Sequence, residues 1–167
     1  MRLSRALLVM AGLLAGVASA AEVETGKLAP TVVRDLHYGD ALFYFYQGED
    51  FEALTRLNAY RQWARTPNHD AEGELLLGGL YLSLGMHNEA AARFGRLLTP
   101  DVPAPIRDRA WYYLAKGWYQ RGYYERSFEA LGRVGSELAE ELEAERDHLT
   151  VNVLMRQGRF EEAAARL

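Results

Sequence analysis

The sequence predicts an all-α protein, an alpha-solenoid of about four helix–turn–helix repeats, the last of them incomplete. Two observations predict this fold class. Four similar segments are centred on the glycines Gly48, Gly85, Gly122 and Gly158, which lie 37, 37 and 36 residues apart. Each glycine follows an apolar helical pattern and precedes an alanine-rich or acidic one, which suits a left-handed residue at a helix C-terminus. A helix–turn–helix unit repeated at such a period is typical of an alpha-solenoid.

The first 20 residues have the pattern of a Sec signal peptide. Two arginines supply a positive start, residues 6–17 are uncharged and mostly apolar, and Ala18-Ser19-Ala20 is the small-x-small pattern that signal peptidase reads. We expect cleavage between Ala20 and Ala21. An uncleaved membrane anchor is the alternative, which the shortness of the apolar run disfavours because a bilayer-spanning helix needs about 20 residues.

Export places the mature protein outside the cytoplasm, in the periplasm or secreted. Among the 19 basic residues only Lys27 and Lys116 are lysine, and this bias towards arginine suggests a GC-rich bacterial genome. Residues 21–30 are expected to form a short linker, followed by the repeat domain at residues 31–167. The repeats should span approximately residues 31–66, 67–103, 104–135 and 136–167.

Local signals place the helices within these repeats. A helix should stop before Thr66-Pro67, because the residue before a proline disfavours helix. Asn68 and Asp70 are both good N-terminal caps for the next helix, Pro105 suits a first helical position, and Gly135-Ser136 breaks the chain. The expected helices lie near residues 32–47, 51–65, from Asn68 or Asp70 to 84, 88–98, 105–121, 124–134 and 137–157, followed by one that is cut off at Leu167.

The residues around each glycine resemble the tetratricopeptide repeat (TPR) family, over roughly residues 31–167. That family places small residues seven before and five after the glycine, an aromatic residue four before it and a large apolar residue nine after it. The third repeat has Ala115, Trp118, Ser127 and Leu131 at these places. Small residues let paired helices approach closely, and the large ones fill the gaps between units. The corresponding residues are Ala41, Tyr44, Ala53 and Leu57 in the first repeat, Gly78, Tyr81, Ala90 and Phe94 in the second, and Val151, Leu154, Ala163 and Leu167 in the fourth.

The pattern departs from the family in three ways. Its period exceeds the family's usual length of about 34 residues, which an insertion at residues 99–105 partly explains. His37 and Asp40 stand where large apolar residues are expected in the first repeat, and Val151 stands where a small residue is usual in the fourth. Gly78 lies in the middle of a predicted helix, where close helix packing explains it better than phosphate binding.

The resemblance implies a concave groove lined by the first helix of each repeat. The side chains at the family's inward-facing places form an aromatic, mostly apolar surface with one basic spot at Arg109 and Lys116. Tyrosine and arginine are over-represented at binding hot spots, so the surface predicts a site for a peptide or helix. Packing of the same tyrosines in the core between repeats is the alternative. The companion residues of the lysine–asparagine clamp that grips chaperone tails are absent. The predicted partner-binding residues are Tyr38, Phe45, Leu82, Arg109, Tyr112, Lys116, Tyr119 and Asn152.

No catalytic, cofactor or metal site is expected. The sequence has no cysteine, which excludes disulfides, zinc fingers, iron–sulfur clusters and thiol nucleophiles. Its four histidines form no HExxH pair, and it contains no Walker loop and no GxSxG motif. The acidic residues between Glu137 and Asp147 suit the start of a solvated helix. A formal charge of −4 disfavours a nucleic-acid binder.

We therefore interpret the sequence as an exported bacterial TPR-containing protein, a non-catalytic scaffold or adaptor that binds a peptide or helix of an envelope protein. No stable membrane insertion is expected after signal cleavage. The alternative is the N-terminal repeat segment of a larger envelope assembly, secretion or polysaccharide-export protein. Its uncapped C-terminal repeat would then self-associate or continue into further repeats, because a solenoid needs a solvated end. A cell-wall-acting enzyme is a third hypothesis, which rests on compartment alone.

Overall fold

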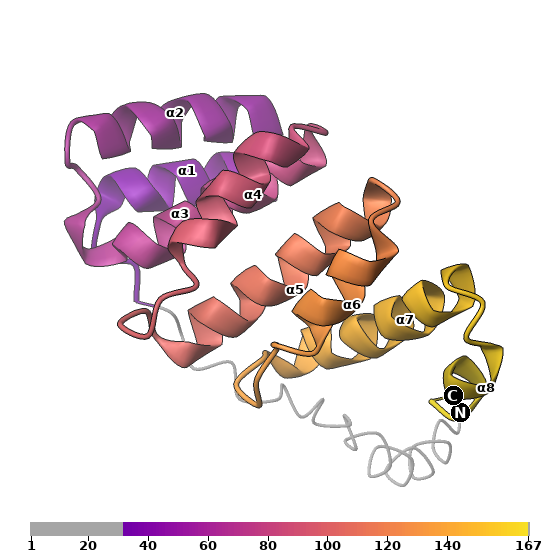
Figure 1. Cartoon of the computed structure of the whole chain (residues 1–167). Helices are drawn as coiled ribbons and strands as arrows, with labels where there is room; N and C mark the ends of the chain where they lie inside the picture. Colours follow the sequence, from indigo (N-terminus) through magenta and orange to yellow (C-terminus); the bar gives the residue numbers. More distant parts are fainter. Residues whose placement is uncertain (1–31, 167) are drawn as a thin grey trace, which may run out of the picture. The chain divides into compact units, whose positions relative to one another are not determined.

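The computed structural model describes residues 32–166 of the chain (Figure 1). The predicted signal peptide, its cleavage site and the linker lie outside these residues, as does Leu167. The described part forms eight α-helices, one 3-10 helix and no strand, which confirms the all-α class. The elements are α1 (Leu36–Tyr46), α2 (Asp50–Gln62), η1 (Pro67–His69), α3 (Asp70–Ser83), α4 (His87–Arg96), α5 (Ala104–Gln120), α6 (Tyr124–Leu131), α7 (Glu140–Arg156) and α8 (Phe160–Ala164).

The helices pack as consecutive pairs, α1 with α2, α3 with α4, α5 with α6, and α7 with α8 (Figure 1). The second helix of each pair also contacts the first helix of the next pair, so that α2 contacts α3, α4 contacts α5 and α6 contacts α7. In addition, α3 contacts α5 and α5 contacts α7. Because each pair contacts mainly its neighbours in sequence, the structure is an alpha-solenoid, as predicted.

A left-handed glycine ends the first helix of every pair, as the spacing predicted. Gly48, Gly85, Gly122 and Gly158 have φ angles of +77°, +74°, +79° and +74°. In each turn, the backbone N–H of the residue that follows the glycine donates to the carbonyl of the residue four positions before the glycine, at 2.8 to 3.0 Å. A residue with a Cβ is strained at such a φ, whereas glycine is not. The four turns therefore reverse the chain in the same way.

The end of α2 repeats this geometry without a glycine. Ala64 has a φ of +51°, the one positive φ outside glycine in the described residues. The Arg65 N–H donates to the Tyr60 carbonyl at 2.9 Å. Because this reversal precedes Pro67, α2 ends at Gln62 and not at the Arg65 expected from the proline.

Hydrogen bonds between distant residues set the starts of α1 and α3 and correct the predicted caps. The Asp35 carboxylate accepts from the backbone N–H of Asn68 at 2.8 Å and from its side-chain amide at 2.7 Å. Asn68 therefore does not cap α3, and Asp70 is the first residue of that helix, which has no side-chain cap. Asp35 itself is extended, so α1 begins at Leu36 and not at residue 32. The other helix ends lie within three residues of those expected.

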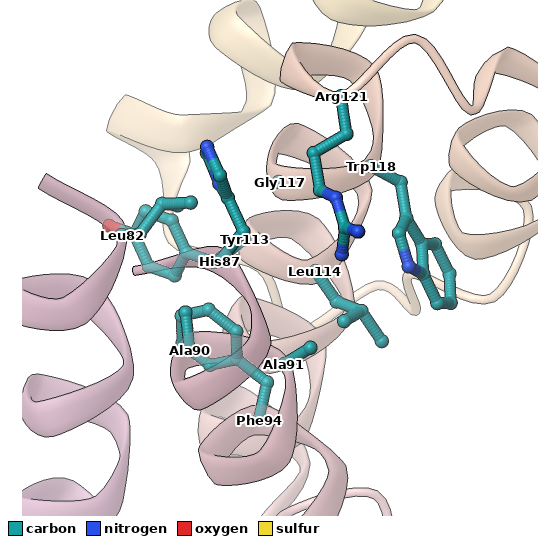
Figure 2. Close-up of a pocket in the computed structure, with 10 residues that line it drawn as sticks. All are labelled: Leu82, His87, Ala90, Ala91, Phe94, Tyr113, Leu114, Gly117, Trp118 and Arg121. Atoms are coloured by element: carbon teal, nitrogen blue, oxygen red, sulfur yellow. The ribbon is translucent and has the colours of Figure 1, made fainter. Parts of the chain in front are cut away.

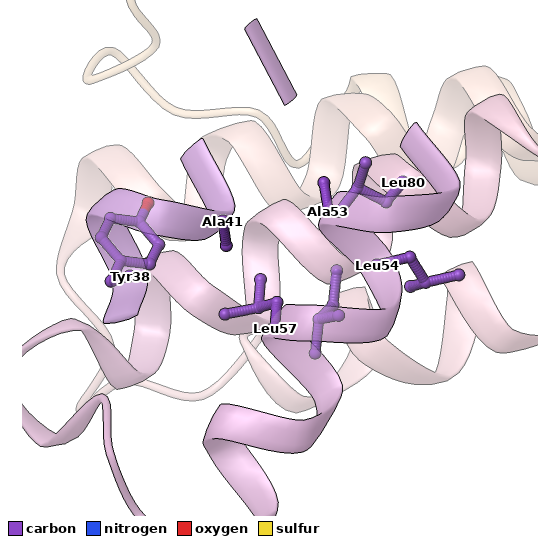
Figure 3. Packing of buried hydrophobic residues seen from close by; sticks show 7 residues of the cluster. Tyr38, Ala41, Ala53, Leu54, Leu57 and Leu80 are labelled. Atoms are coloured by element: carbon purple, nitrogen blue, oxygen red, sulfur yellow. The ribbon is translucent and has the colours of Figure 1, made fainter. Parts of the chain in front are cut away.

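Small residues face each other within the pairs. In the first pair, Ala41 and Ala53 are completely buried beside Leu57, and Figure 3 shows them in the cluster that α1, α2 and α3 share. In the second pair, a Cβ on Gly78 would lie 2.3 Å from Cε1 of Phe94. The packing role predicted for Gly78 is therefore confirmed, because a larger residue would push α4 away from α3.

A buried carboxylate joins the first two pairs. Oε1 of Glu74, on α3, lies 2.7 Å from a guanidinium nitrogen of Arg61 on α2. Arg93 and Arg96 of α4 approach the same oxygen at 3.1 and 3.3 Å. Arg61 also donates to the Asp70 carbonyl at 2.8 Å. Arg61 also pairs with Oδ1 of Asp70 at 2.9 Å, whereas the Arg96 side chain is mostly exposed to solvent.

The left-handed turns predict that two substitutions, one that adds a Cβ and one that removes it, change the free energy of unfolding in opposite directions. Gly122→Ala should lower the free energy of unfolding by about 1 kcal/mol, because a Cβ is strained at positive φ. Ala64→Gly should raise it by about 0.5 kcal/mol, since relief of the same strain exceeds the added freedom of the unfolded chain. Urea unfolding followed by circular dichroism measures both; changes of the same sign would contradict the assignment.

The Glu74 cluster predicts a large loss from a single substitution. Glu74→Ala should destabilise the protein by about 2 kcal/mol, because the mostly buried Arg61 and Arg93 lose their shared acceptor. Glu89→Ala, in the exposed first turn of α4, is the matched control. Equal midpoints in thermal unfolding of the two variants would show that the cluster contributes nothing.

Candidate functional site

The eight predicted partner-binding residues all lie on the first helices α1, α3, α5 and α7, but the structure separates them by accessibility. Two tyrosines are core residues, since Tyr38 and Tyr112 expose 7% and 1% of their surface. These two tyrosines therefore pack in the core between repeats, which the sequence analysis gave as the alternative to a role in binding. The other six keep accessible surface, and we call them the first-helix face: Phe45, Leu82, Arg109, Lys116, Tyr119 and Asn152.

Tyr112 brings together two charged residues of neighbouring first helices. Its hydroxyl donates to Oε2 of Glu145 on α7 at 2.6 Å, and Nζ of Lys116 lies 3.6 Å from the same oxygen. Burial and this hydrogen bond raise the pKa of Tyr112 well above its ordinary value. The Tyr112 hydroxyl, together with Lys116, holds the pKa of the Glu145 carboxyl below its ordinary value. The positive charge predicted at Lys116 is therefore shared with a carboxylate.

Arg109, by contrast, keeps a charge that the described residues do not pair. Among residues 32–166 no carboxylate oxygen pairs with its guanidinium within 4.0 Å. Its Nε is buried and has no hydrogen-bond partner there. Burial raises the pKa of Tyr38 and of Tyr113, and the positive charge of Arg109 acts in the opposite direction on both phenols. Arg109 therefore lies near two tyrosine rings, with hydrogen-bonding capacity to spare.

The sequence did not predict the surroundings of Tyr38. Its ring stacks on the buried His69 ring, with the centroids 4.6 Å apart and the planes 16° apart. His69 Nε2 accepts from the Arg34 N–H at 2.9 Å, and Nδ1 lies 3.8 Å from Oε1 of Glu72. Because these contacts join α1 to the segment before α3, no pattern within one repeat signals them. From the sequence, we predicted only that His69 is a surface or helix-packing histidine.

A narrow pocket lies between the second and third helix pairs. Figure 2 shows its lining, with side chains from α3 and α4 on one side and from α5 on the other. Leu82 is one of them, and a Cβ on Gly117 would lie 3.4 Å from its Cδ1. Arg121, also in the lining, donates to Oδ1 of Asn88 on α4 at 2.8 Å. The pocket thus lies where the second and third helix pairs pack together, and Leu82 belongs both to its lining and to the first-helix face.

The described part of the chain contains no group of three or more histidine or acidic side chains placed to hold a metal ion. Glu140, Glu141 and Glu143 occupy the first turn of α7, where negative charge suits the helix dipole. Within the same residues, no helix has both the length and the apolar character needed to cross a bilayer.

Two solved structures are similar to the chain at a low level. MamA 41-end from Desulfovibrio magneticus RS-1 is 18% identical, with a TM-score of 0.37, and the match covers 78% of this chain and 89% of that one. The MamA RS-1 ArsTM double mutant is 19% identical, with a TM-score of 0.36 and coverage of 78% and 88%. No protein-family model and no curated protein sequence matches the chain. The fold assignment therefore rests on the helix pairs and their turns.

The buried Tyr38 predicts a loss of stability at high pH. Burial raises its pKa from 10.0 to about 12 in the folded protein, so the unfolded chain ionises first. Stability that is present below pH 10.0 is then lost as the pH rises towards 12. Tyr38→Phe should reduce this loss, whereas Tyr123→Phe, at an exposed position outside the surroundings of Tyr38, should behave like the parent. Urea midpoints measured across this range test it; parallel curves for all three proteins would contradict it.

Proposed function

We propose that the chain is a non-catalytic scaffold of the bacterial periplasm that binds a peptide or helix of another protein along the first-helix face. The signal-peptide pattern supports the compartment, and the TPR-like pattern supports a protein partner. The first helices of the last three pairs lie next to one another, since α3 contacts α5 and α5 contacts α7. Such a run of helices offers an extended surface of the kind that repeat proteins use for binding.

Arg109 is the observation that carries this proposal. Its side chain keeps accessible surface and has no carboxylate within 4.0 Å among residues 32–166, so a carboxylate or carbonyl oxygen of a bound partner can pair with the guanidinium. Arg109, Lys116 and Tyr119 are spaced i, i+7 and i+10 on α5 and so share one side of that helix. At 1.5 Å per residue they span about 15 Å, enough for a short peptide or a few turns of helix. Arginine and tyrosine are also the residue types that dominate binding hot spots.

The structure determines which substitutions can test this face. Tyr112→Ala is unsuitable, because removal of a completely buried aromatic ring costs about 3 to 5 kcal/mol and would unfold the third repeat. Arg109 and Tyr119 are only partly buried, so truncation of either costs less stability than truncation of Tyr112, although Tyr119 also hydrogen-bonds Arg156 on α7. Arg109→Gln and Tyr119→Ala therefore separate binding from folding.

We predict that each of these two variants weakens partner binding by at least about tenfold, or 1.4 kcal/mol. The purified protein, immobilised and exposed to envelope extract of the source organism, should retain a partner that both variants lose. Isothermal calorimetry with the captured partner then gives the affinity. Arg107→Gln, on the same helix but outside the first-helix face, is the matched control and should bind like the parent. A partner retained equally by parent and both variants would overturn the assignment of the face.

A further inference from the structure

One side of α1 is apolar and exposed. Leu36, Phe43 and Tyr46 expose 85%, 59% and 79% of their surface. Their spacing of i, i+7 and i+10 aligns them along one side of the helix. Gly39 lies between them, and a Cβ there would be 3.1 Å from Cγ1 of Val33, which folds back over the helix. We call Val33, Leu36, Gly39, Phe43 and Tyr46 the α1 outer face.

The internal repeat identifies the α1 outer face as a stacking face. Phe43 lies five residues before its turn glycine, and Leu80 holds the same place in α3, where it is completely buried in the cluster with α2. Leu36 lies twelve residues before its glycine, and Ala110 holds that place in α5, completely buried in the cluster with α4. The preceding second helix thus covers the place of Phe43 in α3 and the place of Leu36 in α5, whereas Ser83 and Gln120, at the place of Tyr46, are exposed. No helix of the described residues covers these places on α1.

The lack of charge on the α1 outer face limits which kinds of surface can cover it. The α1 outer face has no charged residue, although the chain as a whole carries a formal charge of −4. The acid of α1, Asp40, is directed towards α2, where it accepts from the Tyr60 hydroxyl at 2.8 Å and from Arg56 at 3.2 Å. Two copies of an acidic protein can therefore meet here without bringing like charges together. An uncharged apolar surface of this kind marks association with another apolar surface.

We propose that two copies of this chain pair through the α1 outer face, with α1 antiparallel to α1 across a two-fold axis. A two-fold interface requires a surface that is complementary to itself, and the order of residues supplies one. With the axis midway between Gly39 and Phe43, the Phe43 ring of one copy faces Gly39 and Val33 of the other. In the same register Leu36 of one copy faces Tyr46 of the other. Each large side chain then meets either a small residue or an apolar one.

The first test is the molar mass of the purified full chain in solution, by sedimentation equilibrium from about 1 to about 100 μM, a range that spans weak interfaces. The mass should rise with concentration to twice that of the monomer and no further. Phe43→Glu and Leu36→Lys should remain monomeric throughout, because each places a charge in the apolar contact. Trp63→Glu is the matched control, since Trp63 is equally exposed, at 62%, but lies outside the face, and it should dimerise like the parent.

The absence of cysteine from the sequence allows a second test of the register itself. Leu36→Cys and Tyr46→Cys variants, mixed and oxidised, should form the mixed disulfide in preference to either symmetric one, which mass spectrometry distinguishes. Trp63→Cys should cross-link with neither.

Several results would overturn the proposal. A parent that stays monomeric over the whole range would show that something other than a second copy covers the face. Assemblies that grow beyond two copies, or dimers that survive Phe43→Glu, would place the contact elsewhere. Preference for symmetric disulfides would exclude the antiparallel register. Circular dichroism of every variant excludes loss of folding as the cause, and the exposure of all substituted positions leads us to expect native spectra.

Discussion

The tight left-handed turn at the four glycines is the constraint on which the rest of the structure depends. Each turn returns the chain within a few residues, so the two helices of a pair must lie antiparallel and close together. That closeness leaves room only for small residues where the helices face each other. In the third pair, Ser127 and Ala115 are completely buried, and the Ser127 hydroxyl donates to the Ala115 carbonyl at 2.8 Å. A pair built in this way buries one side of each helix and leaves the other side to be covered by the next pair.

Polar contacts between successive pairs follow the same repeat. Several hydrogen bonds join residues 33 positions apart: Asp50 with Ser83, Asn88 with Arg121, Tyr112 with Glu145, and Asp35 with Asn68. Each joins one pair only to the next. Stability therefore accumulates from neighbour to neighbour along the chain, as in other solenoids, because the main helix contacts within residues 32–166 join neighbouring pairs.

Features that belong to a single repeat could be predicted from the sequence, and features that join two repeats could not. The glycine turns and the packing of Gly78 follow from spacing within one repeat. The bond between Asp35 and Asn68 does not, because it competes with a local cap that the sequence alone favours. The candidate site shows the same division. Arg109 and Lys116 look alike in sequence, but Glu145 from the next repeat pairs only with Lys116. Burial of Tyr112 likewise depends on helix α7, which supplies both the cover and the acceptor for its hydroxyl.

The Glu74 cluster limits how such an array can evolve. Repeat proteins lengthen when a unit is duplicated or moved, which requires that a copy fit beside any neighbour. The carboxylate of α3 takes two of its arginines from its own pair but the third, Arg61, from the pair before it. A copy of the second unit placed elsewhere would carry the acid without this partner, since Leu98 and Gly135 stand at the places that correspond to Arg61 in the next two repeats. A copy of the second unit therefore keeps all three arginines around its carboxylate only when the first unit stands directly before it.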